Sequence, residues 1–369
     1  LAIPWSALVL LCLCFGRGSS LGASAARAAR LRPPLSTRGA DVVDRDGKVA
    51  QLACVNWYGH HLLTYAPGGL EKTSMEEVVG QIVDMGFNCV RLPFSLDMWY
   101  RDPVVPDFAL AGAPELVGIR AVELFDLTVQ ALTDAGIAVI LNNHNSFASW
   151  CCDPMQEDSL WSTREYPTEM WVDAVRSIAE RYAGNQLVCG FDLRNEVRDQ
   201  TDLNNGTVRS VSWGWSDDID TDWKLASERA GAAVQGVAPE MLIIVTGLCY
   251  GLDLRPLHDD PPQLPIEGKL VFTSHVYDFY LWFEVVEAMG YVSWAEVQTA
   301  MLATLILSSI LLSASICYAA RTHKALARHP SAMLVALGVW LLACSGLVWG
   351  GLEVWQGAWT ACRYEIAAE

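Results

Sequence analysis

A carboxyl group at the end of an apolar run is the strongest candidate for chemistry in this sequence. Residues 188–196 read Val-Cys-Gly-Phe-Asp-Leu-Arg-Asn-Glu, a buried-strand pattern that ends abruptly in polar groups. Desolvation at the mouth of such a strand raises the pKa of a carboxyl, so Glu196 is suited to act as a general acid that protonates a glycosidic oxygen. Asn195 beside it can hydrogen-bond a sugar hydroxyl. The alternative is a structural pair at a helix end, with Glu196 in a surface salt bridge to Arg194 or Arg198.

Other polar and aromatic side chains follow further strand-like runs. The guanidinium of Arg91 can hold a carboxylate through two N–H groups. His144 ends another run, and Trp150 follows it with a face suited to stack on a sugar ring. His275 and Tyr277 are two residues apart, which places them on one side of an extended segment. Each residue alone is compatible with a structural role, but polar groups at five of the strand ends indicate one site; they are Asn56, Arg91, His144, Asn195-Glu196 and His275. Further aromatic candidates for lining a cleft are Trp57, Tyr58, Trp213 and Trp215.

The elements that must position these residues alternate between short β-branched runs and longer amphipathic segments. This alternation predicts a parallel sheet, and near-continuous apolar strands indicate that both of its faces are covered. Strands are predicted over 51–57, 87–93, 138–143, 188–194, 242–247 and 269–275, and helices over 74–85, 121–135, 170–182 and 222–236.

The polar residues gather at the carboxyl ends of these strands, which is where a (β/α)8 TIM barrel places its active site. A doubly wound sheet also places function there, but no Gly-rich phosphate loop follows the first strand. The predicted fold class is therefore α/β, of the (β/α)8 TIM-barrel type, and incomplete because only six strands are visible.

The order and spacing of these motifs resemble glycoside hydrolase family 5, the cellulase family, over about residues 41–280. The segments Leu-Ala-Cys-Val-Asn-Trp at 52–57 and Ser-Trp-Cys-Cys at 149–152 are similar to its plant- and alga-like branch. The other matching motifs are Asn-Cys-Val-Arg-Leu around Arg91, the strand end at His144, Leu-Arg-Asn-Glu ending at Glu196, and Ser-His-Val-Tyr ending at Tyr277.

The resemblance implies a TIM barrel that hydrolyses β-glycosidic bonds with retention, on a polysaccharide or oligosaccharide substrate. No metal or cofactor is implied, because two carboxyl groups suffice for this chemistry. Carried over residue by residue, it makes Glu196 the acid/base, Asn195 the contact to the sugar 2-hydroxyl, and Arg91, His275 and Tyr277 the surroundings of the nucleophile. His144 would line the site where glycone and aglycone meet.

Two departures from the family pattern stand out. Val197 follows Asn195-Glu196 where many members have Pro. More seriously, the family places a nucleophilic Glu, followed by Phe-Gly, on a seventh strand, and neither Glu353 nor Glu365 lies in such a pattern. Three explanations for the absent strands are open. The sequence is a fragment of a longer protein, the gene model is erroneous, or the barrel is degenerate and other segments close it. The first is favoured because the sequence starts with Leu rather than Met.

Two functional hypotheses follow from a sequence that has the acid/base motif of the family but not its nucleophile motif. The first is a membrane-tethered, cellulase-like hydrolase whose nucleophile is missing from this chain. The alternative is a non-catalytic carbohydrate-binding or scaffold protein on a degenerate hydrolase barrel. A net charge of −17 disfavours nucleic acid as a partner, because phosphate recognition needs clustered Lys and Arg.

Apolar segments at both ends predict membrane targeting. Two segments without Asp, Glu, Lys or Arg are each long enough to span a bilayer, and the loop between them is basic. By the positive-inside rule the loop is cytosolic and the barrel is lumenal or extracellular. The alternative is a pair of buried core helices. The predicted division is 1–26 signal peptide or N-terminal anchor, 27–40 linker, 41–296 partial barrel, 297–320 transmembrane helix, 321–330 cytosolic loop, 331–352 transmembrane helix and 353–369 tail.

Six cysteines in the barrel region fit an oxidising compartment, and they allow 15 pairings. They show no zinc-like spacing. The adjacent Cys151 and Cys152 are expected in a loop, with at least one of them paired elsewhere. The sequon Asn205-Gly-Thr agrees with secretion.

Overall fold

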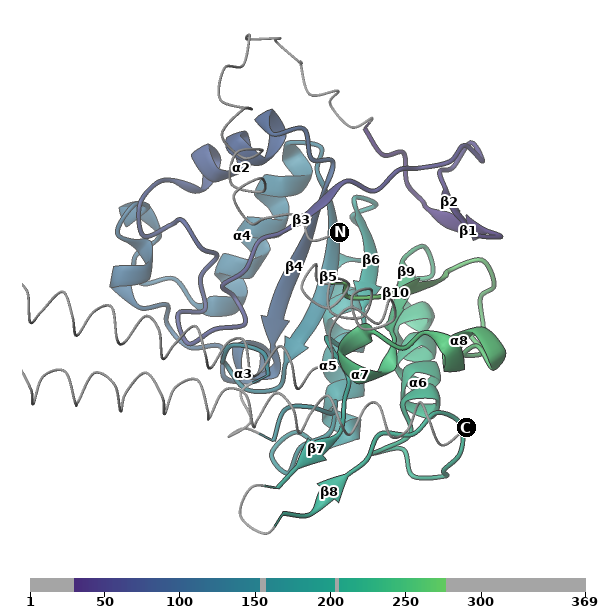
Figure 1. Cartoon of the computed structure of the whole chain (residues 1–369). Coiled ribbons are helices and arrows are strands. Elements are labelled where there is room, and N and C mark those ends of the chain that lie inside the picture. The colour runs from purple at the N-terminus through teal and green to yellow at the C-terminus, as the bar shows by residue number, and fades with distance from the viewer. Residues whose placement is uncertain (1–29, 153–156, 203–205, 277–369) are drawn as a thin grey trace, which may run out of the picture. The chain divides into compact units, whose positions relative to one another are not determined.

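A computed structural model describes residues 30–152, 157–202 and 206–276 (Figure 1). The chain divides into two compact units, 1–275 and 276–369, and the description concerns the first. The predicted signal peptide, both predicted transmembrane segments with their loop and tail, Asn205 and Tyr277 lie outside the described residues. Among the residues that are described, no helix is both long enough and apolar enough to cross a bilayer.

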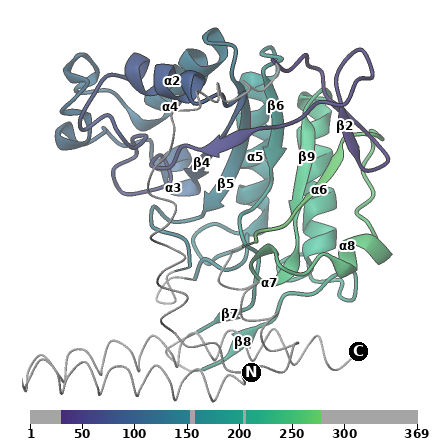
Figure 2. The same ribbon diagram turned by 45° about the horizontal axis from the view of Figure 1, so that its top comes forward.

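A parallel six-stranded sheet forms the centre of the fold, in the order β10-β9-β6-β5-β4-β3 (Figures 1 and 2). This is a half-barrel, which agrees with the predicted incomplete TIM barrel. All six predicted strands form within or close to their expected ranges. They are β3 (Cys54–Asn56), β4 (Cys89–Ser95), β5 (Ala138–Asn145), β6 (Val188–Asp192), β9 (Leu242–Thr246) and β10 (Leu270–Thr273).

Four amphipathic helices connect the strands and pack through a shared apolar core. They are α2 (Met75–Asp84), α4 (Ala121–Asp134), α5 (Thr168–Tyr182) and α6 (Trp223–Val237), each within two residues of its predicted bounds. Their buried residues join one cluster with strand residues such as Leu92 and Phe94 of β4, so these helices cover one face of the sheet. Trp161, Trp171 and Trp223 meet in this core at ring-centroid distances of 4.9 to 6.1 Å.

The N-terminal segment covers part of the other face. Leu31 and Leu35 are buried in a second cluster with Cys89 of β4 and Ile140 of β5. Strands β1 (Ser36–Arg38) and β2 (Asp41–Val43) pair as an antiparallel hairpin. Residues 30–40, which the sequence assigned to a linker, therefore contain ordered structure, because two leucines in an otherwise polar segment have apolar surface to bury.

The segments between the main strands and helices contain several short elements. They are α3 (Leu96–Arg101), the 3-10 turns η1 (Asp107–Leu110) and η2 (Pro114–Leu116), the hairpin β7 (Gln200–Thr201) and β8 (Val208–Arg209), and the short helices α7 (Leu248–Gly251) and α8 (Arg255–Asp259). None of these was predicted from the sequence.

Candidate active site

Glu196 lies in the loop after β6, and its carboxyl group is almost fully buried. Its Oε1 is 2.7 Å from Nδ1 of His275, which follows β10. The backbone of Glu196 has φ +46°, a conformation that costs a non-glycine residue about 1–3 kcal/mol and recurs at functional sites. The structure thus brings together two predicted site residues from strands that are distant in sequence.

Arg91 fixes the neighbouring Asn195. Its Nη2 donates to Asn195 Oδ1 at 3.0 Å, and its Nη1 donates to Asn56 Oδ1 at 3.2 Å. Both Nε and Nη2 lie 2.7 Å from one oxygen of Asp192, a buried carboxylate on β6. Arg91 thus holds a carboxylate through two N–H groups, both of which contact the same oxygen.

The two arginines that flank Glu196 are buried, not at the surface as the alternative interpretation of Glu196 assumed. Arg194 is fully buried and pairs with Asp158 at 2.6 Å. Arg198 is also buried, donates to the backbone oxygen of Glu196 at 2.8 Å, and stacks over the Tyr250 ring at 4.9 Å. Both side chains stabilise the loop that carries Glu196.

His144 and Trp150 lie on the side of the site formed by β5. His144 Nδ1 is 2.9 Å from Asn142 Oδ1, and its ring is 4.4 Å from that of His61. Burial, together with the nearby His61 ring and the positive charge of Arg91, holds the pKa of His144 well below its ordinary value. Burial also lowers the pKa of His61 to about 4. Both imidazoles are therefore neutral near pH 7.

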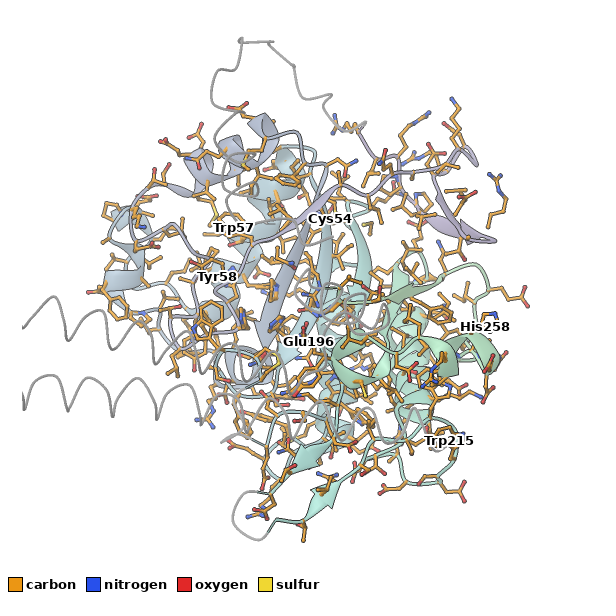
Figure 3. All side chains as sticks on the ribbon, viewed as in Figure 1. Cys54, Trp57, Tyr58, Glu196, Trp215 and His258 are labelled. Atoms are coloured by element: carbon orange, nitrogen blue, oxygen red, sulfur yellow. A yellow bond between two sulfur atoms is a disulfide. The ribbon has the colours of Figure 1, made fainter. Side chains whose placement is uncertain are left out.

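The candidate cleft aromatics separate into exposed and structural groups. Trp150 is 63% exposed and its ring lies 5.5 Å from that of the half-exposed Tyr58. Trp57 and Trp213 are buried and donate to backbone oxygens, so they belong to the core. Trp215 is exposed but lies well apart from Glu196 (Figure 3). Tyr58 and Trp150 are thus the pair available to a sugar ring near the site.

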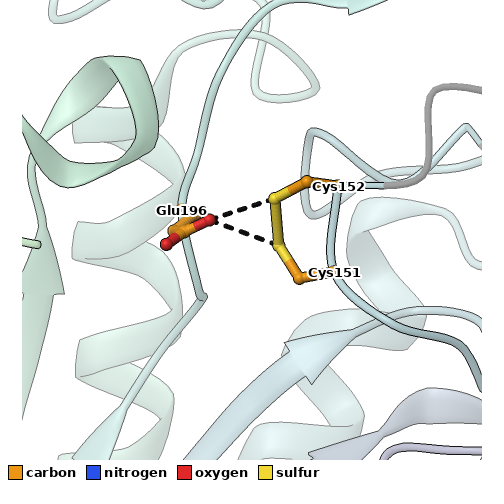
Figure 4. A group of neighbouring side chains, drawn as sticks. All are labelled: Cys151, Cys152 and Glu196. Atoms are coloured by element: carbon orange, nitrogen blue, oxygen red, sulfur yellow. Dashed lines mark hydrogen bonds between the residues drawn. A yellow bond between two sulfur atoms is a disulfide. The ribbon is translucent and has the colours of Figure 1, made fainter. Parts of the chain in front are cut away.

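The adjacent cysteines are bonded to each other, which corrects the expectation that at least one pairs elsewhere. Their sulfurs lie 3.3 Å and 3.0 Å from Glu196 Oε2 (Figure 4). Because disulfide sulfurs carry no proton, they can only accept a hydrogen bond from a protonated Glu196. Asn195 Nδ2 lies 3.3 Å from Cys151 Sγ.

The remaining cysteines of the described sheet are structural. Cys54 and Cys89 form a disulfide between β3 and β4. Cys189 is a buried thiol on β6, and burial raises its pKa to about 12. Its thiol is therefore inert near neutral pH.

Three groups near the site were missed by the sequence analysis as site residues: Asp192, His61 and the Cys151–Cys152 disulfide. A signal did exist for Asp192, since it is the one acid within an otherwise apolar strand. Nothing in the local sequence distinguishes His61 from its neighbour His60, which instead lies in the core between Thr128 and the backbone of Tyr65.

Comparisons with known proteins point to one family. A model of the cellulase family, glycosyl hydrolase family 5, matches residues 43–301. An endoglucanase from Paenibacillus polymyxa is 29% identical over 263 residues, which cover 68% of this chain and 62% of that protein. A glycosyl hydrolase 5 family protein from Chamaecyparis obtusa is 32% identical over 263 residues, covering 67% and 44%. The chain therefore spans less than two thirds of the length of these relatives.

Two solved structures that this chain resembles are those of an endocellulase and an endoglucanase. An endocellulase from Pyrococcus horikoshii in complex with cellotetraose matches with a TM-score of 0.58 and 27% identity, covering 67% of this chain and 70% of that one. The catalytic domain of the major endoglucanase from Xanthomonas campestris matches with a TM-score of 0.57 and 28% identity, with the same coverage.

Proposed function

Because the chain belongs to the cellulase family, glycosyl hydrolase family 5, we propose that the protein hydrolyses β-glycosidic bonds of a glycan with retention of configuration. The observation that carries this proposal is the buried Glu196 after β6, hydrogen-bonded to His275 and preceded by an Asn195 that Arg91 holds. In this proposal Glu196 is the acid/base. It protonates the leaving-group oxygen, then removes a proton from the incoming water.

The residues around Glu196 would then bind and orient the sugar. Asn195 presents its amide to the 2-hydroxyl, and neutral His144 offers a ring nitrogen rather than a charge. The exposed Tyr58 and Trp150 provide an aromatic surface for a pyranose ring. Because a structurally similar endocellulase forms a complex with cellotetraose, a β-linked gluco-oligosaccharide is the substrate to test first.

Retention requires a second carboxylate about 5–5.5 Å from the acid/base. The given sequence contains no strand-like run that ends in Glu-Phe-Gly, so it offers no candidate for this nucleophile. Tyr277, which is predicted to organise the surroundings of the nucleophile, lies outside the described residues. We therefore expect the isolated 369-residue chain not to release product from aryl β-glucosides or soluble β-glucans. Turnover that disappears in Glu196→Gln would show that the chain does contain a nucleophile.

Sugar binding without hydrolysis is the second candidate function, and the lack of a Glu-Phe-Gly motif in the given sequence favours it. Titration calorimetry with cellotetraose tests the site common to both candidates. Binding should weaken in Trp150→Ala and stay unchanged in Trp215→Ala, a matched control that removes an exposed tryptophan apart from Glu196. A coding sequence that continues past Glu369 into a strand with Glu-Phe-Gly would support hydrolysis. A stop codon there would favour the binding protein.

We further propose that the barrel region resides in the lumen or outside the cell, tethered to a membrane. The two uncharged segments at 297–320 and 331–352 and the basic loop between them support this location. The disulfide between Cys54 and Cys89 is consistent with an oxidising compartment.

A further inference from the structure

Three potential metal ligands meet at the candidate acid/base. The sulfurs of Cys151 and Cys152 and a carboxylate oxygen of Glu196 all lie within 4.8 Å of one another (Figure 4). Among the described residues, this is the one group of three or more His, Cys, Asp or Glu side chains with that geometry. In the oxidised form the two sulfurs are joined, so neither is available as a thiolate.

We propose that reduction of the Cys151–Cys152 disulfide creates a binding site for a thiophilic divalent cation, Zn²⁺ or Cd²⁺, with two thiolates and the Glu196 carboxylate as ligands. Thiolate ligands select such cations over Mg²⁺ and Ca²⁺. Zinc sits about 2.3 Å from sulfur and about 2.0–2.2 Å from carboxylate oxygen, so its ligands lie roughly 3–4 Å from one another. The oxygen of Glu196 is already 3.0 and 3.3 Å from the two sulfurs.

The reaction that opens the site is a thiol–disulfide exchange. A dithiol reductant transfers two electrons and two protons to the Cys151–Cys152 bond and leaves as a cyclic disulfide. The S–S bond breaks, and each cysteine becomes a thiol. The cation then replaces the two thiol protons and, where Glu196 is protonated, its carboxyl proton, and all of these protons are released to solvent.

Neighbouring groups already hold two of the three ligands in position. Asn195 Nδ2 lies 3.3 Å from Cys151 Sγ, where its N–H stabilises a thiolate. His275 Nδ1 lies 2.7 Å from Glu196 Oε1, which leaves Oε2 directed at the sulfurs. Partners of this kind orient metal ligands, and their loss costs about 10–100-fold in metal affinity.

A cation bound here would coordinate the carboxyl group that the proposed function assigns to proton transfer. This consequence rests on that function, whereas the binding site itself does not. The reduced, metal-loaded protein would be unable to protonate a leaving group, so a soft cation would inhibit only after reduction. Metal binding therefore has to be measured separately from hydrolysis.

The test is a Cd²⁺ titration of the full chain, followed by ultraviolet thiolate-to-cadmium charge-transfer absorption. One sample is oxidised, and the other is treated with dithiothreitol and desalted under nitrogen. We expect the reduced protein to bind one more Cd²⁺ per chain than reduced Cys151→Ser/Cys152→Ser, which corrects for the other reduced cysteines. The Cys152→Ser single variant, which keeps Cys151 and its Asn195 contact, provides the same comparison if the double variant does not fold.

The carboxylate ligand is tested by Glu196→Gln, which we expect to weaken Cd²⁺ binding at least about tenfold, the scale of a lost metal-site interaction. Glu169→Gln, at an exposed acid on α5, should leave the affinity unchanged. Equal binding by the oxidised and reduced proteins, by the cysteine variants and wild type, or by Glu196→Gln and wild type would each overturn the proposal. The absorption is independent of turnover, so a chain that hydrolyses nothing still tests the site.

Discussion

Arg91 contributes both to the stability of the fold and to the organisation of the site. Its guanidinium pairs with the buried carboxylate of Asp192 and also holds Asn195. Removing one partner of a buried pair leaves an uncompensated charge, so Arg91→Ala should lower the free energy of unfolding by about 3–5 kcal/mol. Urea denaturation measures this loss. The control is Arg176→Ala, which removes an exposed i,i+4 pair with Glu180 worth about 0.3–0.5 kcal/mol. Equal losses in the two variants would contradict the stabilising role assigned to the buried Arg91–Asp192 pair.

The buried histidines make a prediction about pH. Burial lowers the pKa of His61 to about 4 and that of His60 to about 3, whereas an unfolded histidine titrates near 6.5. As pH falls below about 6.5, the unfolded chain gains protons that the folded chain does not, so stability decreases from there toward pH 4. Above about 6.5 these residues contribute no pH dependence.

The measurement is the free energy of unfolding between pH 7.5 and 5. Each of these histidines should contribute a slope that approaches 1.4 kcal/mol per pH unit. His61→Phe should reduce the slope by the contribution of one histidine, because it removes one titrating group. Within the described residues neither ring nitrogen of His61 has a hydrogen-bond partner, so the substitution breaks no hydrogen bond. A slope unchanged by this substitution would show that His61 is already protonated or exposed in the folded state.

The residues of the candidate site could be predicted where a strand pattern ended in a polar group. Asn195, Glu196 and His275 were found in this way, and the structure places Glu196 against His275. Their catalytic roles stay predictions. The contact between Glu196 and the Cys151–Cys152 disulfide could not be predicted, because a chain separation of 44 residues carries no local signal.

At the scale of elements, α6 begins at a cap that also organises the preceding loop. The buried Asp222 accepts from Leu225 N at the helix start and from Gly214 N and Ser216 N in the loop. Loss of an N-cap costs about 0.5–2 kcal/mol, and Asp222→Ala should exceed this range because the loop amides lose their acceptor as well. Thermal or urea unfolding measures the cost.

The matched control is Ser74→Ala at the start of α2. Ser74 Oγ accepts from Glu77 N and caps its helix at a more exposed position. This substitution should cost about 1 kcal/mol. If both variants lose the same stability, then the additional hydrogen bonds of Asp222 contribute nothing measurable.

Periodicity explains why the larger elements were predictable and the short ones were not. Helices of 10–15 residues with one apolar face, such as α5, and strands with apolar runs, such as β9, carry their pattern within their own sequence. The α7 segment instead contains left-handed residues at Cys249 and Tyr250, and the β7–β8 hairpin pairs only two residues a side. Tertiary contacts determine such elements, so local sequence does not reveal them.

At the scale of the whole molecule, the location of the barrel is testable through Asn205. We expect this residue to be glycosylated when the chain is translated with microsomes, because the proposed topology places residues 41–296 in the lumen. A mobility shift removed by endoglycosidase, and absent from Asn205→Gln, measures the modification. Unmodified Asn205 together with a barrel that added protease digests from the cytosolic side would reverse the proposed orientation.

The two terminal strands of the described sheet differ in how they are attached. β3 is tied to β4 by the Cys54–Cys89 disulfide, whereas β10 pairs with β9 and contains no cysteine. The disulfide keeps β3 attached to β4 when their hydrogen bonds open, whereas within the described residues only hydrogen bonds and packing hold β10 to β9. The two edges of the described half-barrel therefore differ: one has a covalent tie to its neighbouring strand and the other does not. Amide hydrogen exchange should be slower along β3 than along β10, and strand exchange between molecules, where it occurs, should begin at the β10 end.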